Sequence, residues 1–405
     1  MEYTIGTLVL IPAVAVVAPI LMISVGRWIA IPLVVFEIIL GLLLGPAVLG
    51  WIVPDDLALF FADFGLAMLF FLAGNEIDFR LIRGRPLTRA AIGWIISLAA
   101  GLGLAALVAP HLSAVAFVGI ALTSTALGTI MPVLRDSGDL KTPFGIAVVA
   151  LGAVGEFGPL LAISLFLSGR SPLTAALVLI GFAMVAGIAI WLAARGTGHR
   201  LHRLITLTMH TSSQFGVRLV VLVLVSLVGL SVILDLDMLL GAFTAGVLYR
   251  LLLSGAPEND KQLIEGKVEA LGYGFLVPIF FIYTGVTFDL AALFADGRTL
   301  GLLPIALLGM LVVRGLPSLL AAPPGSSRRD LTATALFGAT GLPIIVAVTA
   351  IGVDAGDIST GTAAALVGAG MLSVLLFPLI ALSLRKRPTD AAAGAGDDLR
   401  IPAEG

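Results

Sequence analysis

Long apolar stretches, separated by short breaks rich in charged residues, proline or glycine, run through the whole chain. A helix needs about 20 predominantly apolar residues to cross a bilayer, and cutting at the breaks gives about thirteen segments close to that length. The pattern predicts an all-α polytopic membrane protein with about thirteen transmembrane helices. These segments lie near residues 5–26, 29–46, 57–74, 90–109, 114–134, 142–168, 172–194, 213–234, 237–254, 268–288, 299–322, 331–353 and 359–384.

Composition agrees with this class and narrows the chemistry. Of the 405 residues, 59% are hydrophobic and 12% charged, whereas soluble domains run near 45–50% apolar and about 25% charged. The chain has no cysteine, and its four histidines show no metal-ligand spacing. No Ser/His, His-Glu-x-x-His or paired-Asp constellation occurs. We therefore expect no cofactor, no nucleic-acid partner and no enzymatic activity.

Basic residues gather in alternate connections between the segments, and the other set of connections holds only Arg170 and Arg298. By the positive-inside rule this alternation predicts a multi-pass cell-membrane protein with its N-terminus outside and its C-terminus in the cytoplasm. Residues 389–405, rich in Ala, Gly and Asp, are expected to form a disordered cytoplasmic tail.

Two similar stretches indicate an internal repeat. The sequence FFLAGNEIDF at 70–79 ends the third segment, and FFIYTGVTFD at 280–289 ends the tenth. The offset of seven segments is odd, so the second copy is inverted in the membrane, an architecture found in secondary transporters. We expect one transporter unit over 1–388, with repeats at about 5–168 and 213–384 and a linker helix at 172–194. Chance similarity of two apolar stretches is the alternative.

The same offset relates segments five and twelve, and both are interrupted by glycine and proline. The first contains Gly128 and Pro132, and the second contains Gly338, Gly341 and Pro343. Paired broken helices in corresponding positions point to a transporter's binding site, whereas in either helix alone such residues equally mark a packing kink. Freed carbonyls and the hydroxyl groups of Thr123, Ser124 and Thr125 are candidate oxygen ligands for a desolvated cation.

Two isolated charges lie deep in apolar segments. Glu156 is central in the run 142–168, between Gly155 and Gly158–Pro159, and an intramembrane acid usually faces a protein interior or a watery cavity. Arg314 keeps its charge, so it needs either half-helix carbonyls or Glu156 as a partner. The alternatives are a protonated Glu156 that bonds a neighbouring helix, and an Arg314 that extends to the membrane surface.

Two further acidic positions receive structural interpretations. Glu37, within segment two, is interpreted as a protonated side chain at a repeat or dimer interface. Glu76 and Asp78, beside a basic loop, are interpreted as an interfacial structural or gating cluster.

Several motifs occur together and in family order: LGLLLGP at 40–46, LAGNEID at 72–78, TSTALGTIMP at 123–132, the Glu156 helix and PIFFIYTG at 278–285. With these, the chain resembles the bacterial monovalent cation:proton antiporter family of Kef-type sodium/hydrogen exchangers over residues 10–385. The resemblance implies a homodimer in which a mobile core domain with two crossed broken helices works beside a dimerisation domain. It places the family's essential acid on Glu156 and its basic residue on Arg314. Electrogenic relatives carry two adjacent acids and a Lys, whereas here Gly155 and Phe157 flank Glu156.

Taken together, these features predict a secondary antiporter that exchanges Na⁺ or K⁺ for protons by alternating access. Glu156 would carry the proton or cation, Arg314 would be a fixed countercharge, and Ser124 and Thr125 would join Glu156 as cation ligands. One shared carboxylate predicts electroneutral exchange. A cation channel or uniporter, and an organic-anion symporter on the same fold, remain the alternatives.

Overall fold

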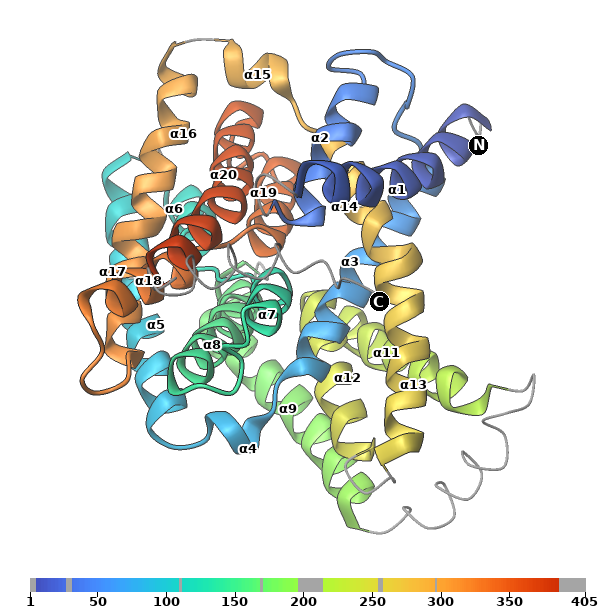
Figure 1. Cartoon of the computed structure of the whole chain (residues 1–405), viewed down its shortest axis with the longest axis vertical. Helices are drawn as coiled ribbons and strands as arrows, with labels where there is room; N and C mark the ends of the chain where they lie inside the picture. The colour runs from blue at the N-terminus through green and yellow to red at the C-terminus, as the bar shows by residue number, and fades with distance from the viewer. Residues whose placement is uncertain are drawn as a thin grey trace, which may run out of the picture.

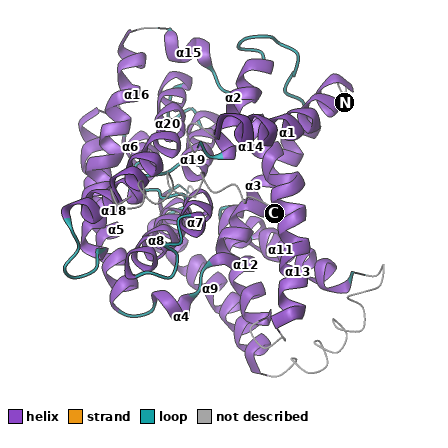
Figure 2. Ribbon diagram, in the orientation of Figure 1, coloured by secondary structure: helices purple, strands orange, loops and turns teal. Residues whose placement is uncertain are grey.

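The computed structural model describes residues 5–26, 31–108, 111–167, 170–195, 214–253, 258–295 and 297–385; the predicted tail lies outside these ranges. Within them the secondary structure is helical and no strand occurs (Figure 2). Eight helices of this described part are long and apolar enough to cross a membrane, and five shorter apolar helices accompany them. Each of the predicted segments falls on one of these helices, so the all-α membrane fold is confirmed.

The helical elements follow one another with short connections. In chain order they are α1 (Ile5–Gly26), α2 (Leu33–Leu44), α3 (Asp56–Glu76), α4 (Phe79–Ile82), α5 (Arg85–Val108), α6 (Leu112–Ala121), α7 (Leu127–Asp136), α8 (Pro143–Phe166), α9 (Pro172–Arg195), α11 (Phe215–Ile233), α12 (Met238–Leu253), α13 (Glu258–Leu271), the π-helical turn η1 (Gly272–Leu276), α14 (Val277–Val286), α15 (Leu290–Phe294), α16 (Gly297–Met310), the π-helical turn η2 (Leu311–Gly315), α17 (Leu316–Ser318), the 3₁₀ turn η3 (Leu319–Ala321), α18 (Arg328–Gly338), α19 (Pro343–Asp354) and α20 (Thr360–Arg385).

The helices form two neighbouring groups. Figure 1 shows α5–α8 with α16–α20 on the left, and α1–α3 with α11–α14 on the right. Contacts of α8 with α12 and of α3 with α7 join the two groups directly. Helix α9 contacts both α8 and α12 and so lies between the groups. The helix predicted at 172–194 is present as α9.

Two helix pairs of the right-hand group pack at very short range. In the pair α3–α12 the approach uses Gly74 and Gly246, and in the pair α2–α14 it uses Gly41 and Gly285. A Cβ atom at any of these four positions would overlap a main-chain carbonyl oxygen of the partner helix. Each pair therefore depends on one glycine from each helix, because only glycine lets the two backbones come this close.

Both predicted interruptions are present and they cross. The first lies between the end of α6 at Ala121 and the start of α7 at Leu127, and the second lies between α18 and α19. The backbone N–H of Ala126 donates a 2.7 Å hydrogen bond to the carbonyl oxygen of Thr340. A backbone N–H of the first break is thus hydrogen-bonded by a carbonyl of the second. Non-helical backbone at membrane depth needs such partners, because lipid offers none.

Two segments differ from their predicted form. Segment ten begins well before residue 268, because α13 starts at Glu258 and continues through η1 into α14. The charged Glu and Lys residues of this stretch suggested a loop, but they are good helix formers, as are the Gln and Leu residues between them. Segment eleven contains the π-helical turn η2, which carries Arg314. Such turns are frequent at functional sites.

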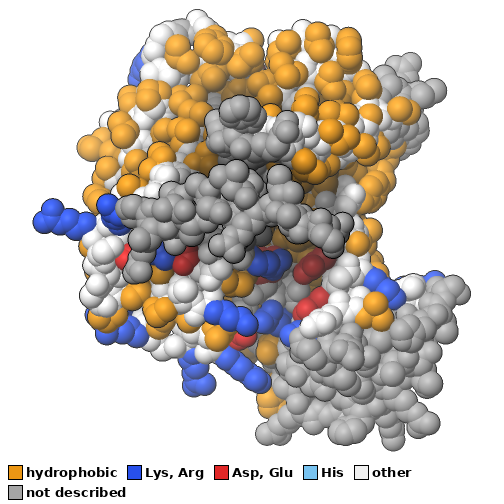
Figure 3. All heavy atoms as spheres, in the orientation of Figure 1, with side chains coloured by type: hydrophobic (Ala, Val, Ile, Leu, Met, Phe, Trp, Pro, Cys, Tyr) orange, Lys and Arg blue, Asp and Glu red, His pale blue; other side chains and the backbone are white. Residues whose placement is uncertain are grey.

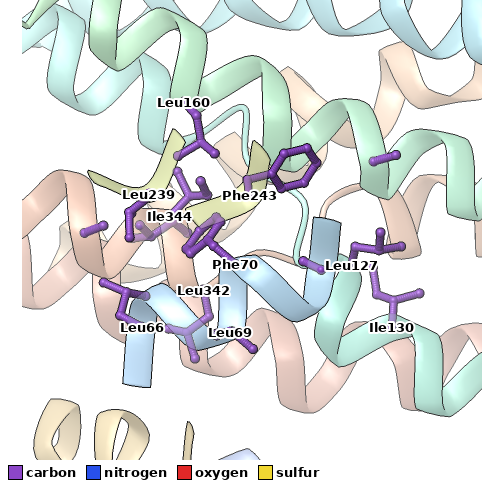
Figure 4. Packing of buried hydrophobic residues seen from close by; sticks show 14 of the residues in the cluster. Leu66, Leu69, Phe70, Leu127, Ile130, Leu160, Leu239, Phe243, Leu342 and Ile344 are labelled. Carbon is purple, nitrogen blue, oxygen red and sulfur yellow. The ribbon is translucent and has the colours of Figure 1, made fainter. Parts of the chain in front are cut away.

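Buried apolar side chains fill the contact between the two groups. Figure 4 shows Phe70 of α3 near Leu239 of α12 and Leu342 of the second break, and all three are almost fully buried. On the face shown in Figure 3, hydrophobic side chains cover the upper part, and most of the visible Lys and Arg side chains lie in the lower half. The crossed breaks therefore lie beside a packed apolar contact.

Candidate functional site

Glu156 lies in the middle of α8 with its side chain only 3% exposed. Its Oε1 accepts hydrogen bonds from the backbone N–H groups of Leu127 at 2.8 Å and Gly128 at 3.4 Å, the first two residues of α7. A helix N-terminus carries unpaired donors and partial positive charge, so it stabilises a carboxylate. The second oxygen, Oε2, is buried without a hydrogen-bond partner. One oxygen is therefore held in place while the other remains free to bind.

Arg314 is completely buried in η2, which rules out the interpretation that it reaches the membrane surface. Its Nε donates to the hydroxyl oxygen of Thr125 at 2.8 Å, and its Nη2 donates to the carbonyl oxygen of Leu151 at 2.8 Å. Its Nη1 has no partner. No ion pair joins Arg314 to Glu156 among the described residues. The guanidinium is therefore held by neutral oxygens, but these are a hydroxyl and a carbonyl in the middle of α8, not the half-helix ends or the Glu156 carboxylate expected from the sequence.

Thr125 connects four parts of the site. Its hydroxyl donates to the carbonyl oxygen of Gly338, the last residue of α18, at 2.6 Å while accepting from Arg314. Its backbone N–H donates to the carbonyl oxygen of Gly155 at 3.0 Å. That carbonyl is available because residue 159, four positions later, is a proline without an N–H. Thr125 thereby fixes the first break against α8, α18 and Arg314 together.

Gly155 has to be small for this arrangement to exist. A Cβ atom at residue 155 would overlap the side chain of Thr125 and lie 2.8 Å from Nη2 of Arg314. Residue 155, on the N-terminal side of Glu156, therefore has no room for a side chain.

The two other hydroxyl residues of the first break are buried beside Thr125. Thr123 donates to the carbonyl oxygen of Ile120 at 2.8 Å, and Ser124 donates to that of Ala121 at 3.1 Å. Ser124 also faces the second break, since a Cβ at Gly341 would lie 2.6 Å from its Oγ. The structure thus brings Ser124, Thr125, Arg314 and the Glu156 helix together, and each hydroxyl hydrogen is already used on a carbonyl.

Ser373 of α20 was not identified from the sequence. Its Oγ accepts from the backbone N–H of Gly341 at 3.1 Å and donates to the carbonyl oxygen of Gly370 at 2.7 Å, and it is fully buried. It therefore holds the second break against α20. The available signal was a hydroxyl in the middle of the apolar helix, one turn after Gly370.

A cavity of about 1170 Å³ approaches Glu156. Its lining includes Leu69, Gly128 and Thr129, and Gly128 is one of the two residues that bind the Glu156 carboxylate. The lining also includes Asp139 and Arg385, which form an ion pair at 2.8 Å. Glu156 itself does not line the cavity, but its hydrogen-bond donor Gly128 does.

The two remaining acids lie in different places. Glu37 lines the cavity wall formed by α2. Glu76 accepts a 3.2 Å hydrogen bond from the hydroxyl of Tyr273 at the end of α3. Beside it, Arg250 pairs with Asp78 at 3.4 Å. Glu76 and Asp78 therefore belong to a polar cluster at the end of α3, and Tyr273 of this cluster also lines the cavity.

Residues 13–382 match the family described as sodium/hydrogen exchanger, transmembrane. Because the match covers most of the chain, the protein belongs to this family of membrane transporters. Among individual relatives, the putative Na⁺/H⁺ antiporter YjbQ of Bacillus subtilis is 28% identical over 404 residues, which cover 95% of this chain and 64% of the relative. The Na⁺/H⁺ antiporter of Enterococcus hirae is 27% identical over 65% of this chain and 69% of its own length.

The fold also matches a solved structure. The sodium proton antiporter MjNhaP1 of Methanocaldococcus jannaschii, at pH 8, superposes with a TM-score of 0.63 over 94% of this chain and 99% of that chain, at 17% identity. The present chain therefore has the sodium/proton antiporter fold, although it spans only about two thirds of the length of the Bacillus subtilis relative.

Proposed function

We propose that this protein exchanges a monovalent cation, Na⁺ or K⁺, for protons by alternating access in the cell membrane. The observation that carries the proposal is the state of the Glu156 carboxyl group. One oxygen is fixed by the N-terminus of α7, and the other is buried, unpartnered and close to a cavity. A buried carboxylate without a partner for its charge is costly. It is therefore poised to take up either a proton or a cation.

Exchange follows from this single group. The Glu156 carboxyl binds a proton or a cation but not both, so each species can cross only by displacing the other. Ser124 and Thr125 would supply neutral oxygens to the cation. In the present conformation Thr125 already accepts a hydrogen bond from Arg314, so a bound cation would compete with the guanidinium for that oxygen.

Electroneutral exchange is the expected stoichiometry. Arg314 remains protonated in proteins and serves as a fixed countercharge. No second acid fits at residue 155, because a side chain there would overlap Thr125. One carboxyl that binds one proton or one monovalent cation moves no net charge in a complete cycle.

Inverted repeats and a Kef-type subfamily identity are part of the proposal. The repeat relation between segments three and ten would carry the pair α3–α12 onto the pair α14–α2. Both pairs depend on one glycine from each helix packed against a carbonyl, which supports that relation. A homodimer, with the N-terminus outside and the C-terminus cytoplasmic, is proposed from the resemblance and from the distribution of basic residues.

An organic-anion symporter would use the same cavity differently. Its volume of about 1170 Å³ is large enough for a small organic molecule. However, the one basic side chain that lines it within the described ranges, Arg385, is paired with Asp139 and Asp330. An anion would meet no unpaired positive charge, so cation exchange accounts for the cavity better. A channel or uniporter would need a continuous pore, whereas this cavity stops short of Glu156.

The test is flux into vesicles that contain the purified protein and an internal pH dye. The wild-type protein should change the internal pH when Na⁺ or K⁺ is imposed on one side. Glu156→Gln should abolish this response, because glutamine still accepts from Leu127 but carries neither a proton nor countercharge; Glu156→Asp should retain part of it. If the Glu156→Gln vesicles respond like wild type, Glu156 is structural and the proposed mechanism is wrong.

A further inference from the structure

Glu37 is a second buried acid that the exchange mechanism does not use. It lies in α2, lines the cavity and is only 3% exposed. Within the described residues its carboxyl group has no hydrogen-bond or ion-pair partner. A protonated glutamate with a structural role inside the chain would be expected to donate its proton to a neighbouring acceptor, and among the described residues none contacts it. Contacts within the chain therefore assign Glu37 no structural role.

The surroundings of Glu37 leave its charge uncompensated. Neighbouring lining residues include the apolar Val34, Pro278 and Phe281. The charged residues among the lining are Glu37 itself, Asp139 and Arg385, and Arg385 is shared between Asp139 and Asp330. The charged residues that line the cavity, together with Asp330, which pairs with Arg385, thus sum to an excess of negative charge. A cavity with one sign of charge and apolar walls concentrates counter-ions.

The backbone that carries Glu37 is held rigidly. Gly41, one helical turn later, packs against the carbonyl of Ile282 in α14, and Gly285 of α14 packs against the carbonyl of Ile38. Glu37 therefore projects from a fixed wall. A separate part of the lining, formed by α7, contributes Gly128 and Thr129, and Gly128 binds the Glu156 carboxylate.

We propose that Glu37 forms a second monovalent-cation site, which holds a cation in the cavity before the cation passes to Glu156. The role in transport rests on the proposed exchange function, whereas binding at Glu37 does not require it. An unpartnered buried carboxylate that lines a cavity of about 1170 Å³ gives a cation the negative ligand, and water in the cavity supplies the remaining oxygens.

Binding is tested first in a protein that cannot exchange. Purified Glu156→Gln protein is unfolded thermally in NaCl or KCl, with choline chloride at the same ionic strength as the reference. Because Glu37 is intact, the midpoint should still rise with the concentration of Na⁺ or K⁺. The rise should disappear in Glu156→Gln/Glu37→Gln and persist in Glu156→Gln/Asp63→Asn, since Asp63 of α3 is exposed and outside the cavity.

Two results would overturn the proposal at this stage. One is a Glu156→Gln protein that shows no cation-dependent rise. The other is a double variant with Glu37→Gln whose rise equals that of Glu156→Gln alone. The choline reference reports folding of each variant separately, and Glu37→Asp, which keeps the charge, provides a second variant that should retain the rise. Vesicle exchange is not involved, so a failure of the exchange function leaves this result interpretable.

Transport then tests the role of the site. In the vesicle assay, Glu37→Gln should raise the half-saturating cation concentration about tenfold through loss of local counter-ion concentration, and leave the maximal rate nearly unchanged. Glu37→Asp should lie between wild type and Glu37→Gln, and Asp63→Asn should behave as wild type. A half-saturating concentration that Glu37→Gln leaves unchanged would exclude Glu37 from the cation's path.

Discussion

Replacing Thr125 by valine removes one hydroxyl group and nearly conserves the shape of the side chain. The hydroxyl makes two fully buried hydrogen bonds, one to the carbonyl of Gly338 at 2.6 Å and one from the Arg314 guanidinium at 2.8 Å. A hydrogen bond to a charged group is worth about 1.5–3 kcal/mol and a neutral one about 0.5–1.5 kcal/mol. Thr125→Val should therefore lower the free energy of unfolding by about 2–4 kcal/mol.

The matched control is Thr123→Val, two residues earlier in the same break. Its hydroxyl is equally buried but donates only to the carbonyl of Ile120 in the preceding turn. That substitution should cost about 1 kcal/mol or less, and Thr125→Ser, which retains the hydroxyl, should cost a similar amount. The measurement is reversible unfolding in mixed detergent micelles, followed by tryptophan fluorescence.

Two outcomes would refute the reasoning. If Thr125→Val destabilises the protein no more than Thr123→Val, the guanidinium contact contributes nothing to stability. In the exchange assay, Thr125→Val should also weaken apparent cation affinity more than maximal rate, because one neutral ligand is lost. An unchanged affinity in Ser124→Ala combined with Thr125→Val would remove both side chains from the cation site.

Three further predictions concern the neighbourhood of Glu156. Gly155→Ala should abolish most exchange and destabilise the protein, since the added methyl group overlaps Thr125. The control is Gly181→Ala in α9, where a Cβ meets nothing within 4 Å; it should be neutral or slightly stabilising. If the two variants have equal effects in unfolding and flux assays, the packing argument is wrong. Arg314→Lys should keep part of the exchange rate by keeping the charge, whereas Arg314→Ala should lose rate and stability together; equal rates in the two variants would argue against a countercharge role. Na⁺ exchange in vesicles clamped with K⁺ and valinomycin should proceed equally at every potential, because an electroneutral cycle moves no net charge. Each net charge moved would change the driving force by about 2.3 kcal/mol per 100 mV, so Na⁺ accumulation that follows the potential would demand a second proton carrier.

The sequence predicted the features that leave a one-dimensional signal. Hydropathy located the membrane segments, and isolation within apolar runs singled out Glu156 and Arg314. Glycine and proline marked both interrupted segments, although Gly128 and Pro132 lie inside α7 and the first break precedes them. The sequence also indicated that the Gly155 carbonyl is free to accept a hydrogen bond from outside its helix, because the residue four positions later is Pro159, which has no N–H. These signals need no knowledge of which segments lie side by side.

Other features depend on contacts that no local pattern encodes. The role of Thr125 arises from partners 189 and 213 residues away. The contact of Ser373 with Gly341 likewise depends on how α20 crosses the second break. The position of Glu37 at the cavity was harder still to predict. Apart from Glu37, α2 is apolar on all sides, so periodicity does not indicate which side faces a cavity.

The crossing of the two breaks has a consequence for biosynthesis. The first break enters the membrane early, but its partners at Gly338 and Thr340 are synthesised roughly 200 residues later. Until then the N–H of Ala126 and the hydroxyl of Thr125 lack their final acceptors, and such long-range pairing closes slowly. The nascent chain must therefore keep residues 122–126 hydrated or sheltered by the insertion machinery while most of the second half is translated. A chain that stalls before residue 338 would display an open polar backbone inside the bilayer, a feature by which membrane quality control can distinguish unfinished molecules from finished ones.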